Sequence, residues 1–250
     1  MTKKIVKEFK GFSSSRILLL NKSGKLVVKK EKNIQRNIER MLVLEKEFNV
    51  PKIYSTGKNF FEMEYIHGLD IVSYLNTHKS EELIIFLRKT LLKFKKKINN
   101  NKKDYKPVYE KFLNNLNILN FLPFKKNELI KKLPRYLPQT EYHGDFTLEN
   151  IIYSNKNKFY LIDCSEGIFD SYIFDYSKLR QDIQLMWLLR NRNSYIEVKL
   201  QHIYNELKSN FKYMENNSLL ILMLLRVLRH AKKDSIEFNF LLSNIKKLWK

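Results

Sequence analysis

The chain has 250 residues, 44% of them hydrophobic and 13% aromatic, and its 47 Lys and Arg against 26 Asp and Glu give a formal net charge of +21. This length permits one large domain or two small lobes around a sizeable core, and the composition excludes disorder, a collagen-like repeat and a low-complexity chain. The single cysteine, Cys164, excludes an intrachain disulfide, so a reducing, cytoplasmic location is expected.

The first part of the chain has the pattern of strands around one helix. Runs of aliphatic and β-branched residues on either side of a glycine-containing turn at 21–24 predict a hairpin. Apolar residues at helical spacing then predict a helix, and Pro51 marks the return to extended structure. The expected strands cover 5–9, 15–20, 25–29, 53–55 and 60–65, and the expected helix covers 32–48. We expect residues 1–66 to form a small, strand-rich lobe.

The remainder of the chain, residues 67–250, is mostly helical in pattern. The expected helices cover 81–98, 108–121 and 125–133 and continue from 175 onward, with a polar loop at 99–103 and a short hairpin of strands 151–153 and 159–162. The longest apolar run, 219–225, is far shorter than the roughly 20 residues that a helix needs to cross a bilayer. The expected fold class is therefore α+β, with a larger helical lobe following the strand-rich one.

The most specific motif is His143-Gly-Asp-Phe-Thr-Leu-Glu-Asn150, which Leu161-Ile-Asp163 follows. Phosphoryl transfer requires a carboxylate that positions the acceptor hydroxyl and oxygen ligands that hold Mg²⁺ on the phosphates. Asp145 is placed to orient and deprotonate a hydroxyl, and Asn150 and Asp163 offer the hard oxygen atoms that Mg²⁺ prefers. The spacing therefore predicts a catalytic loop followed by a metal site.

This spacing resembles that of the aminoglycoside phosphotransferase and choline kinase group, and the match spans roughly residues 9–180. The resemblance implies a two-lobe, protein-kinase-like fold. It also implies an enzyme that uses ATP and Mg²⁺ to phosphorylate a hydroxyl group of a small molecule, with Asp145 in the catalytic role. His143 is expected to hydrogen-bond the backbone around the catalytic loop rather than to carry a proton.

The resemblance also assigns residues to nucleotide binding. The loop that contains Ser13, Ser14 and Ser15 is similar to the serine-containing nucleotide loop of these kinases. The backbone of Glu64 and Ile66 is expected to form the hinge that pairs with adenine.

A lysine on the third strand should contact the non-transferred phosphates. The resemblance places Lys29 there, although Lys25 and Lys30 are alternatives among many lysines. Glu39, in the following helix, is the expected ion-pair partner of Lys29, and Glu45 is its alternative.

Departures from the protein-kinase pattern indicate the acceptor. Gly144 stands where protein kinases usually carry Arg, and eleven residues between Asp163 and Asp175 leave little room for an activation loop. These features favour a small-molecule or glycan acceptor. The segment 178–182 resembles kinase-like proteins associated with surface-polysaccharide biosynthesis, so a sugar or surface-glycan precursor is the expected acceptor.

The charge of the chain bears on its partners. Lys outnumbers Arg 37 to 10 and is scattered along the chain, which argues against specific nucleic-acid binding. A field this positive attracts anionic ligands and permits peripheral contact with an anionic membrane surface, and it disfavours polycationic aminoglycosides. An aminoglycoside or choline/amino-alcohol kinase and a pseudokinase-type nucleotide-binding module remain the alternatives, and the sequence leaves the oligomeric state open.

Overall fold

The computed structural model describes residues 3–9, 15–32, 34–192, 194–211 and 213–250, and its contacts divide the chain into two compact units. The first unit contains Met1–Tyr74 and Glu149–Glu166, and the second contains Leu75–Leu148 and Gly167–Lys250. This division differs from the expected one at residues 66 and 67. The reason is that the hairpin at residues 151–161 pairs with a short strand at Gly68–Asp70 and so joins the first unit.

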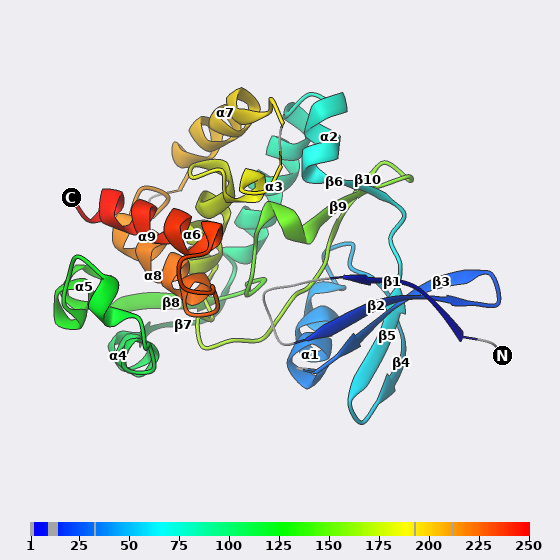
Figure 1. The fold of residues 1–250 in the computed structure, drawn as a ribbon, viewed down its shortest axis with the longest axis horizontal. Coiled ribbons are helices and arrows are strands. Elements are labelled where there is room, and N and C mark those ends of the chain that lie inside the picture. The colour runs from blue at the N-terminus through cyan, green and yellow to red at the C-terminus, as the bar shows by residue number, and fades with distance from the viewer. Residues whose placement is uncertain (1–2, 10–14, 33, 193, 212) are drawn as a thin grey trace. The chain divides into compact units, whose positions relative to one another are not determined.

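A five-stranded antiparallel sheet forms most of the first unit (Figure 1). Its hairpin turn contains Ser23 and Gly24, whose φ angles of 51° and 86° are those of a two-residue primed turn. The aliphatic residues of the hairpin strands are largely buried. The order in the sheet is β1-β2-β3-β5-β4, and its elements are β1 (Lys3–Phe9), β2 (Arg16–Lys22), β3 (Lys25–Glu31), β4 (Ile53–Gly57) and β5 (Phe60–Glu64), with α1 (Ile34–Leu44) between β3 and β4. The hairpin and the helix predicted from the sequence are confirmed.

A second, three-stranded sheet completes the first unit, with the order β10-β9-β6. It is built from β6 (Gly68–Asp70), β9 (Ile151–Ser154) and β10 (Lys158–Leu161), and α2 (Ile71–Thr77) follows β6 directly. Tyr74 packs its ring 4.6 Å from that of Tyr153 and 5.3 Å from that of Phe159, measured between centroids. This aromatic cluster packs the β9–β10 hairpin against α2. The packing helps to position the end of the hairpin, where residue 163 follows.

Gly68 is required where β6 meets β9. A Cβ atom at this position would lie 2.1 Å from the carbonyl oxygen of Tyr153, a backbone atom that cannot move without breaking the strand pairing. We therefore expect Gly68→Ala to lower the free energy of unfolding by about 1–3 kcal/mol in urea titrations. Gly167→Ala is the matched control, because a Cβ there meets its nearest atom at 4.0 Å. Equal unfolding curves for the two variants would contradict the close approach of Gly68 to the backbone of Tyr153.

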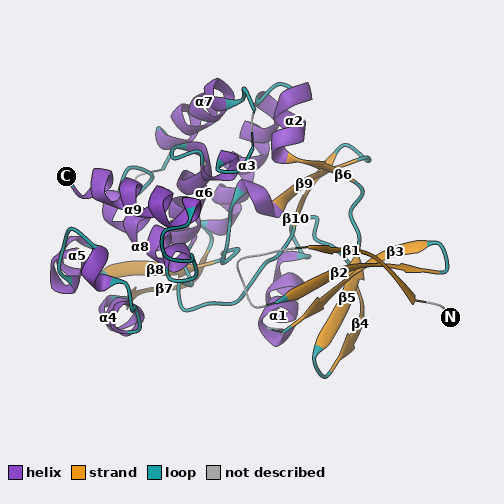
Figure 2. Ribbon diagram, viewed as in Figure 1, coloured by secondary structure: helices purple, strands orange, loops and turns teal. Residues whose placement is uncertain are grey.

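Helices dominate the second unit (Figure 2). Every residue of α6 is buried, α8 buries most of its length, and α8 packs against both α6 and α9. Its elements are α3 (Glu81–Phe94), β7 (Lys97–Asp104), α4 (Lys106–Asn114), α5 (Lys126–Lys132), β8 (Tyr136–Thr140), α6 (Tyr172–Ile183), α7 (Glu197–Lys208), α8 (Asn217–Leu228) and α9 (Ile236–Trp249), with single 3₁₀ turns at Leu119–Phe121, Leu148–Asn150 at the unit boundary, and Trp187–Leu189. None of the helices in the described part of the chain has the length and apolar character that crossing a bilayer requires.

One predicted loop is wrong. Residues 99–103 belong to β7, which pairs antiparallel with β8 through contacts such as Lys102 with Pro138 and Asp104 with Tyr136. The strand consists almost entirely of Lys and Asn, so it lacks the apolar alternation by which a strand is predicted. Its partner strand, more than thirty residues away in sequence, determines its conformation instead.

Candidate active site

Two carboxylates on α6 hold the loop that begins at His143. Asp175 is 2% exposed and accepts hydrogen bonds from the backbone N–H groups of His143, Gly144 (3.0 Å) and Phe146 (3.4 Å). Asp182 is fully buried and accepts one from the backbone N–H of Leu148 at 2.6 Å. Buried carboxylates are tolerated when their oxygens receive hydrogen bonds, so the loop and the helix stabilise each other. The loop is therefore fixed along its length before any ligand arrives.

The first residues of this loop orient Asp145. Gly144 has a φ of 89°, in the left-handed region that favours glycine. This backbone conformation explains why the residue between His143 and Asp145 is a glycine. The ring of His143 is fully buried, and its Nδ1 accepts a hydrogen bond of 3.3 Å from the backbone N–H of Asp145. The backbone N–H of Thr147 donates to the carbonyl oxygen of Asp145 at 2.9 Å. The backbone of Asp145 is thereby held from both sides.

A lysine pairs with the carboxylate of Asp145, and an arginine from a second helix adds positive charge beside it. Lys178 on α6 places its Nζ 3.0 Å from Oδ1 of Asp145. Arg226 on α8 donates to the carbonyl oxygen of Gly144 at 3.1 Å. Burial by itself would raise the pKa of Asp145, but the charges of Lys178 and Arg226 outweigh it and lower the pKa to about 2. Asp145 is therefore ionised throughout the neutral range and can accept a hydrogen bond from a hydroxyl.

Asn150 and Asp163 lie at the same end of the β9–β10 hairpin, in the first unit. The register pairs Ile151 with Leu161, and the backbone N–H of Ile162 donates to the carbonyl oxygen of Asn150 at 3.0 Å. Asp163 has a φ of 56°, a left-handed conformation that is uncommon for any residue other than glycine and that often marks a functional site. Its side chain is 41% exposed. The hairpin register thus brings the backbones of these two residues to the same end of the hairpin.

These oxygen ligands fit a magnesium ion. No group of three or more His, Cys, Asp and Glu side chains gathers into a metal cluster among the residues that the structure describes. Mg²⁺ does not require one, because it keeps several waters and is held through one or two protein oxygens together with phosphate oxygens. A carboxylate at Asp163 and an amide oxygen at Asn150 are donors of the right kind.

The lysine that meets Asp163 is Lys30, not Lys29. The side chain of Lys30 is 7% exposed and forms a salt bridge with Oδ1 of Asp163. Lys29 points to the other face of the sheet, where it pairs with Glu31 at 2.7 Å and lies over the ring of Phe60. The expectation for Lys29 is corrected because β3 runs on to Glu31, so that Lys30 belongs to the strand and shares a face with Val28.

Glu39 does not act as the partner of the strand lysine in this structure. It lies on the exposed face of α1 and accepts a hydrogen bond from Gln35 at 2.6 Å. The buried face of the helix carries Asn37, which is 2% exposed and donates through Nδ2 to the carbonyl oxygen of Cys164 at 2.6 Å. The helix position that contacts the segment after Asp163 is therefore occupied by an amide, and the ion pair that the structure contains is Lys30–Asp163 rather than the expected Lys29–Glu39.

Comparison with known proteins gives the fold. No family model and no curated protein match the sequence, but solved structures do. Choline kinase LicA from Streptococcus pneumoniae matches with a TM-score of 0.65 and 14% identity, over 100% of this chain and 93% of that one. Aminoglycoside phosphotransferase APH(4)-Ia matches with 0.64 and 10% identity over 99% and 93%, and Plasmodium vivax ethanolamine kinase with 0.59 and 13% over 98% and 82%. The chain has the fold of the protein-kinase-like small-molecule kinases. The expected α+β fold class is thereby confirmed.

Other nucleotide-binding expectations can be located on this small-molecule kinase fold. Ser13 and Ser14 lie outside the described residues, whereas Ser15 is 8% exposed immediately before β2. Glu64 is the last residue of β5, and its backbone N–H donates to the carbonyl oxygen of Lys52 at 2.8 Å. Ile66 follows outside the strand.

Several residues of the site were missed by sequence reasoning. Lys30 is an alternative to Lys29 in the sequence, and strand register is the signal that selects it. Helical spacing with the other buried positions of α1 gives the signal for Asn37, which was missed. The segment 178–182 is noted by resemblance, but nothing local in the sequence predicts that Lys178, Asp182 and Arg226 contact the loop, because their partners lie 33 to 82 residues away.

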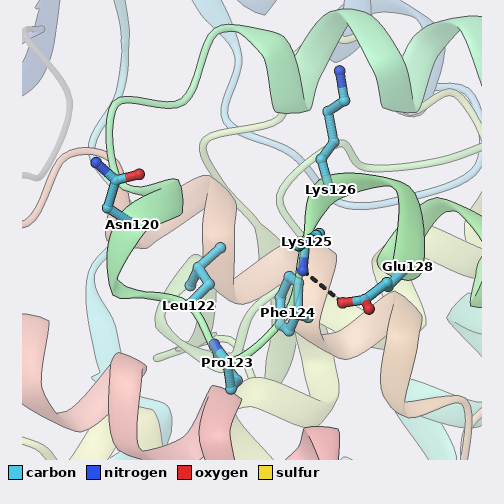
Figure 3. A pocket seen from close by; sticks show the side chains of 7 residues that line it. All are labelled: Asn120, Leu122, Pro123, Phe124, Lys125, Lys126 and Glu128. Atoms are coloured by element: carbon cyan, nitrogen blue, oxygen red, sulfur yellow. Dashed lines mark hydrogen bonds between the residues drawn. The ribbon is translucent and has the colours of Figure 1, made fainter.

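An open pocket in the second unit is separate from this site (Figure 3). Its charged side chains already have local roles: Glu128 accepts from the backbone N–H of Lys125 at 2.7 Å at the start of α5, and Lys126 donates to Asn114. The lining consists of Asn120, Leu122, Pro123, Phe124, Lys125, Lys126 and Glu128. None of these residues belongs to the loop at His143 or to α6.

Proposed function

We propose that this protein is an ATP- and Mg²⁺-dependent phosphotransferase that phosphorylates a hydroxyl group of a small molecule. The observation that carries the proposal is the loop at His143, which two buried carboxylates lock and which presents an ionised Asp145. Positioning and electrostatics are what phosphoryl transfer requires of a protein.

Asp145 acts on the acceptor. Its carboxylate accepts a hydrogen bond from the acceptor hydroxyl, whose oxygen attacks the γ-phosphorus while the bond to the ADP oxygen breaks. The hydroxyl proton passes to the carboxylate. With a pKa of about 2, Asp145 is a weak base, so the proton moves late, when the new P–O bond has made the hydroxyl acidic. Before that point, Asp145 serves to orient the hydroxyl.

Residues of the first unit hold the nucleotide. Asn150 and Asp163 would hold Mg²⁺, which neutralises phosphate charge when bound. Lys30 supplies a cation for the non-transferred phosphates, and the backbone at Glu64 and Ile66 pairs with adenine. Among proteins with this fold, an aminoglycoside phosphotransferase is known in a ternary complex with ADP and hygromycin B, and LicA in a complex with AMP. These complexes support nucleotide binding by the same fold.

The acceptor is a neutral or anionic molecule, in our proposal a sugar or surface-glycan precursor. Lys178 already neutralises Asp145, and Arg226 adds a further positive charge beside the loop. A polycationic acceptor needs the reverse, an acidic surface around the catalytic carboxylate. The net charge of +21 also steers anionic molecules toward the protein.

A screen of acceptors tests both parts of this proposal. We expect Mg²⁺-dependent ADP release to be stimulated most by neutral or acidic sugars and sugar phosphates, and least by choline, ethanolamine and kanamycin-like aminoglycosides. Stimulation by an anionic acceptor should weaken as rising salt brings the Debye length below roughly 10 Å. A preference for aminoglycosides would contradict the proposed acceptor class but would leave the proposed kinase activity intact. The absence of both ATP binding and ADP release would contradict the proposed kinase activity itself.

A further inference from the structure

Lys178 is a buried lysine that pairs with Asp145. Its side chain is 6% exposed, on a helix in which every residue is buried. Burying an ammonium group is costly, and apolar residues of similar size usually stabilise a core as well as a buried ion pair does. The lysine therefore calls for an explanation other than stability.

The geometry of Lys178 connects it to the catalytic loop. Its Nζ lies 3.0 Å from Oδ1 of Asp145, a charge-assisted hydrogen bond. The helix that carries it also carries Asp175 and Asp182, which hold the backbone of the same loop. One rigid element thus fixes both the loop and the charged end of its central side chain.

The catalytic loop has no cation of its own for this task. Between His143 and Asn150 the sequence contains no Lys or Arg. Arg226 contacts the backbone carbonyl of Gly144 rather than the carboxylate. A directional partner limits rotation of a carboxylate about its Cβ–Cγ bond, so the bond from Lys178 restricts the directions in which Asp145 presents its lone pairs to the acceptor.

We propose that Lys178 is a positioning residue for Asp145: it holds Oδ1 and so sets the direction in which the carboxylate receives the acceptor hydroxyl. This inference rests on the proposed function. Lys178 changes no bond in the reaction, and the proton of the hydroxyl still passes to Asp145. The lysine acts through orientation, and its effect should therefore depend on the carboxylate.

The experiment compares Lys178→Met with the wild-type protein, following ADP release from Mg·ATP with water or with the best acceptor from the screen. We expect kcat to fall about 10- to 100-fold while KM for Mg·ATP stays within about threefold, because orientation is lost but nucleotide binding is not. Lys178→Arg should recover kcat to within about tenfold of wild type. Lys103→Met is the matched control, because Lys103 pairs with Asp170 at 2.8 Å in the same unit; it should leave kcat within about twofold.

A double-variant cycle separates positioning from a merely structural role. In the Asp145→Asn background, Lys178→Met should change kcat by less than about twofold, since the carboxylate through which it acts is gone. An equal loss in both backgrounds, or wild-type kcat in Lys178→Met alone, would overturn the inference while leaving the kinase in place. If Lys178→Met does not fold, Lys178→Gln serves in the same cycle. Failure of the wild-type protein to bind or turn over Mg·ATP would instead remove the proposed function, and this inference with it.

Discussion

Asp145→Asn is expected to lower kcat by about 10²- to 10⁴-fold, the usual contribution of a positioned general base. The amide keeps the shape of the carboxylate and can accept a hydrogen bond from Lys178, but it cannot take the proton of the acceptor. Affinity for Mg·ATP should remain within about threefold, because the residues assigned to the nucleotide and the metal, Lys30, Asn150 and Asp163, belong to the other unit of the chain. Steady-state kinetics together with calorimetric titration of Mg·ATP measure the two quantities.

Asp104→Asn is the control for this variant. Asp104 belongs to the same unit and pairs with Arg135 at 2.9 Å, so its replacement removes an ion-paired carboxylate outside the catalytic loop. It should leave kcat unchanged within about twofold. Turnover by Asp145→Asn within threefold of wild type, in the presence of a measurable acceptor reaction, would show that another residue positions the hydroxyl.

The features that the sequence predicts well are those set by near neighbours in the chain. The hairpin of β2 and β3 follows from aliphatic runs around the turn at Ser23 and Gly24. The loop from His143 to Asn150 is recognisable because its spacing is local and its backbone needs glycine at one position. In both cases the residues that determine the structure lie within about one turn or one hairpin of each other.

The choice between neighbouring residues depends on register, which the sequence does not fix. Lys29 and Lys30 are adjacent, and a shift of one residue in a strand exchanges the two faces. The structure pairs Lys30 with Phe61 of β5 and buries it, so this lysine and not its neighbour meets Asp163. Asn37 and Glu39 are separated by two residues, about 200° around a helix, and therefore face opposite ways.

Contacts between distant elements are the part that sequence reasoning could not supply. Lys178 and Asp145 are 33 residues apart, and Arg226 and Gly144 are 82 residues apart. Their approach depends on how α6 and α8 pack, which periodicity alone does not predict. The positive charge that Lys178 and Arg226 place around Asp145 therefore becomes visible only in the structure, whereas the acceptor class is already expected from the net charge and the segment 178–182.

Asp163→Ala is expected to abolish the gain in ATP affinity that Mg²⁺ provides, and Asn150→Ala to remove only part of it. A carboxylate neutralises metal charge, whereas a neutral amide contributes a dipole. In the absence of Mg²⁺ the order should differ: Asp163→Ala releases Lys30 from its salt bridge, so this lysine can pair with the phosphates and metal-free ATP should bind at least as tightly as to wild type.

Calorimetric titrations of ATP with and without Mg²⁺ measure both effects, independently of any acceptor. Glu31→Ala is the matched control, because Glu31 is also a lysine-paired carboxylate of the first unit, at 2.7 Å from Lys29 on the other face of the sheet. It should leave the Mg²⁺-dependent gain intact. A larger loss in Asn150→Ala than in Asp163→Ala would show that the metal is held mainly by the amide. Weaker metal-free binding in Asp163→Ala would show that Lys30 does not serve the phosphates.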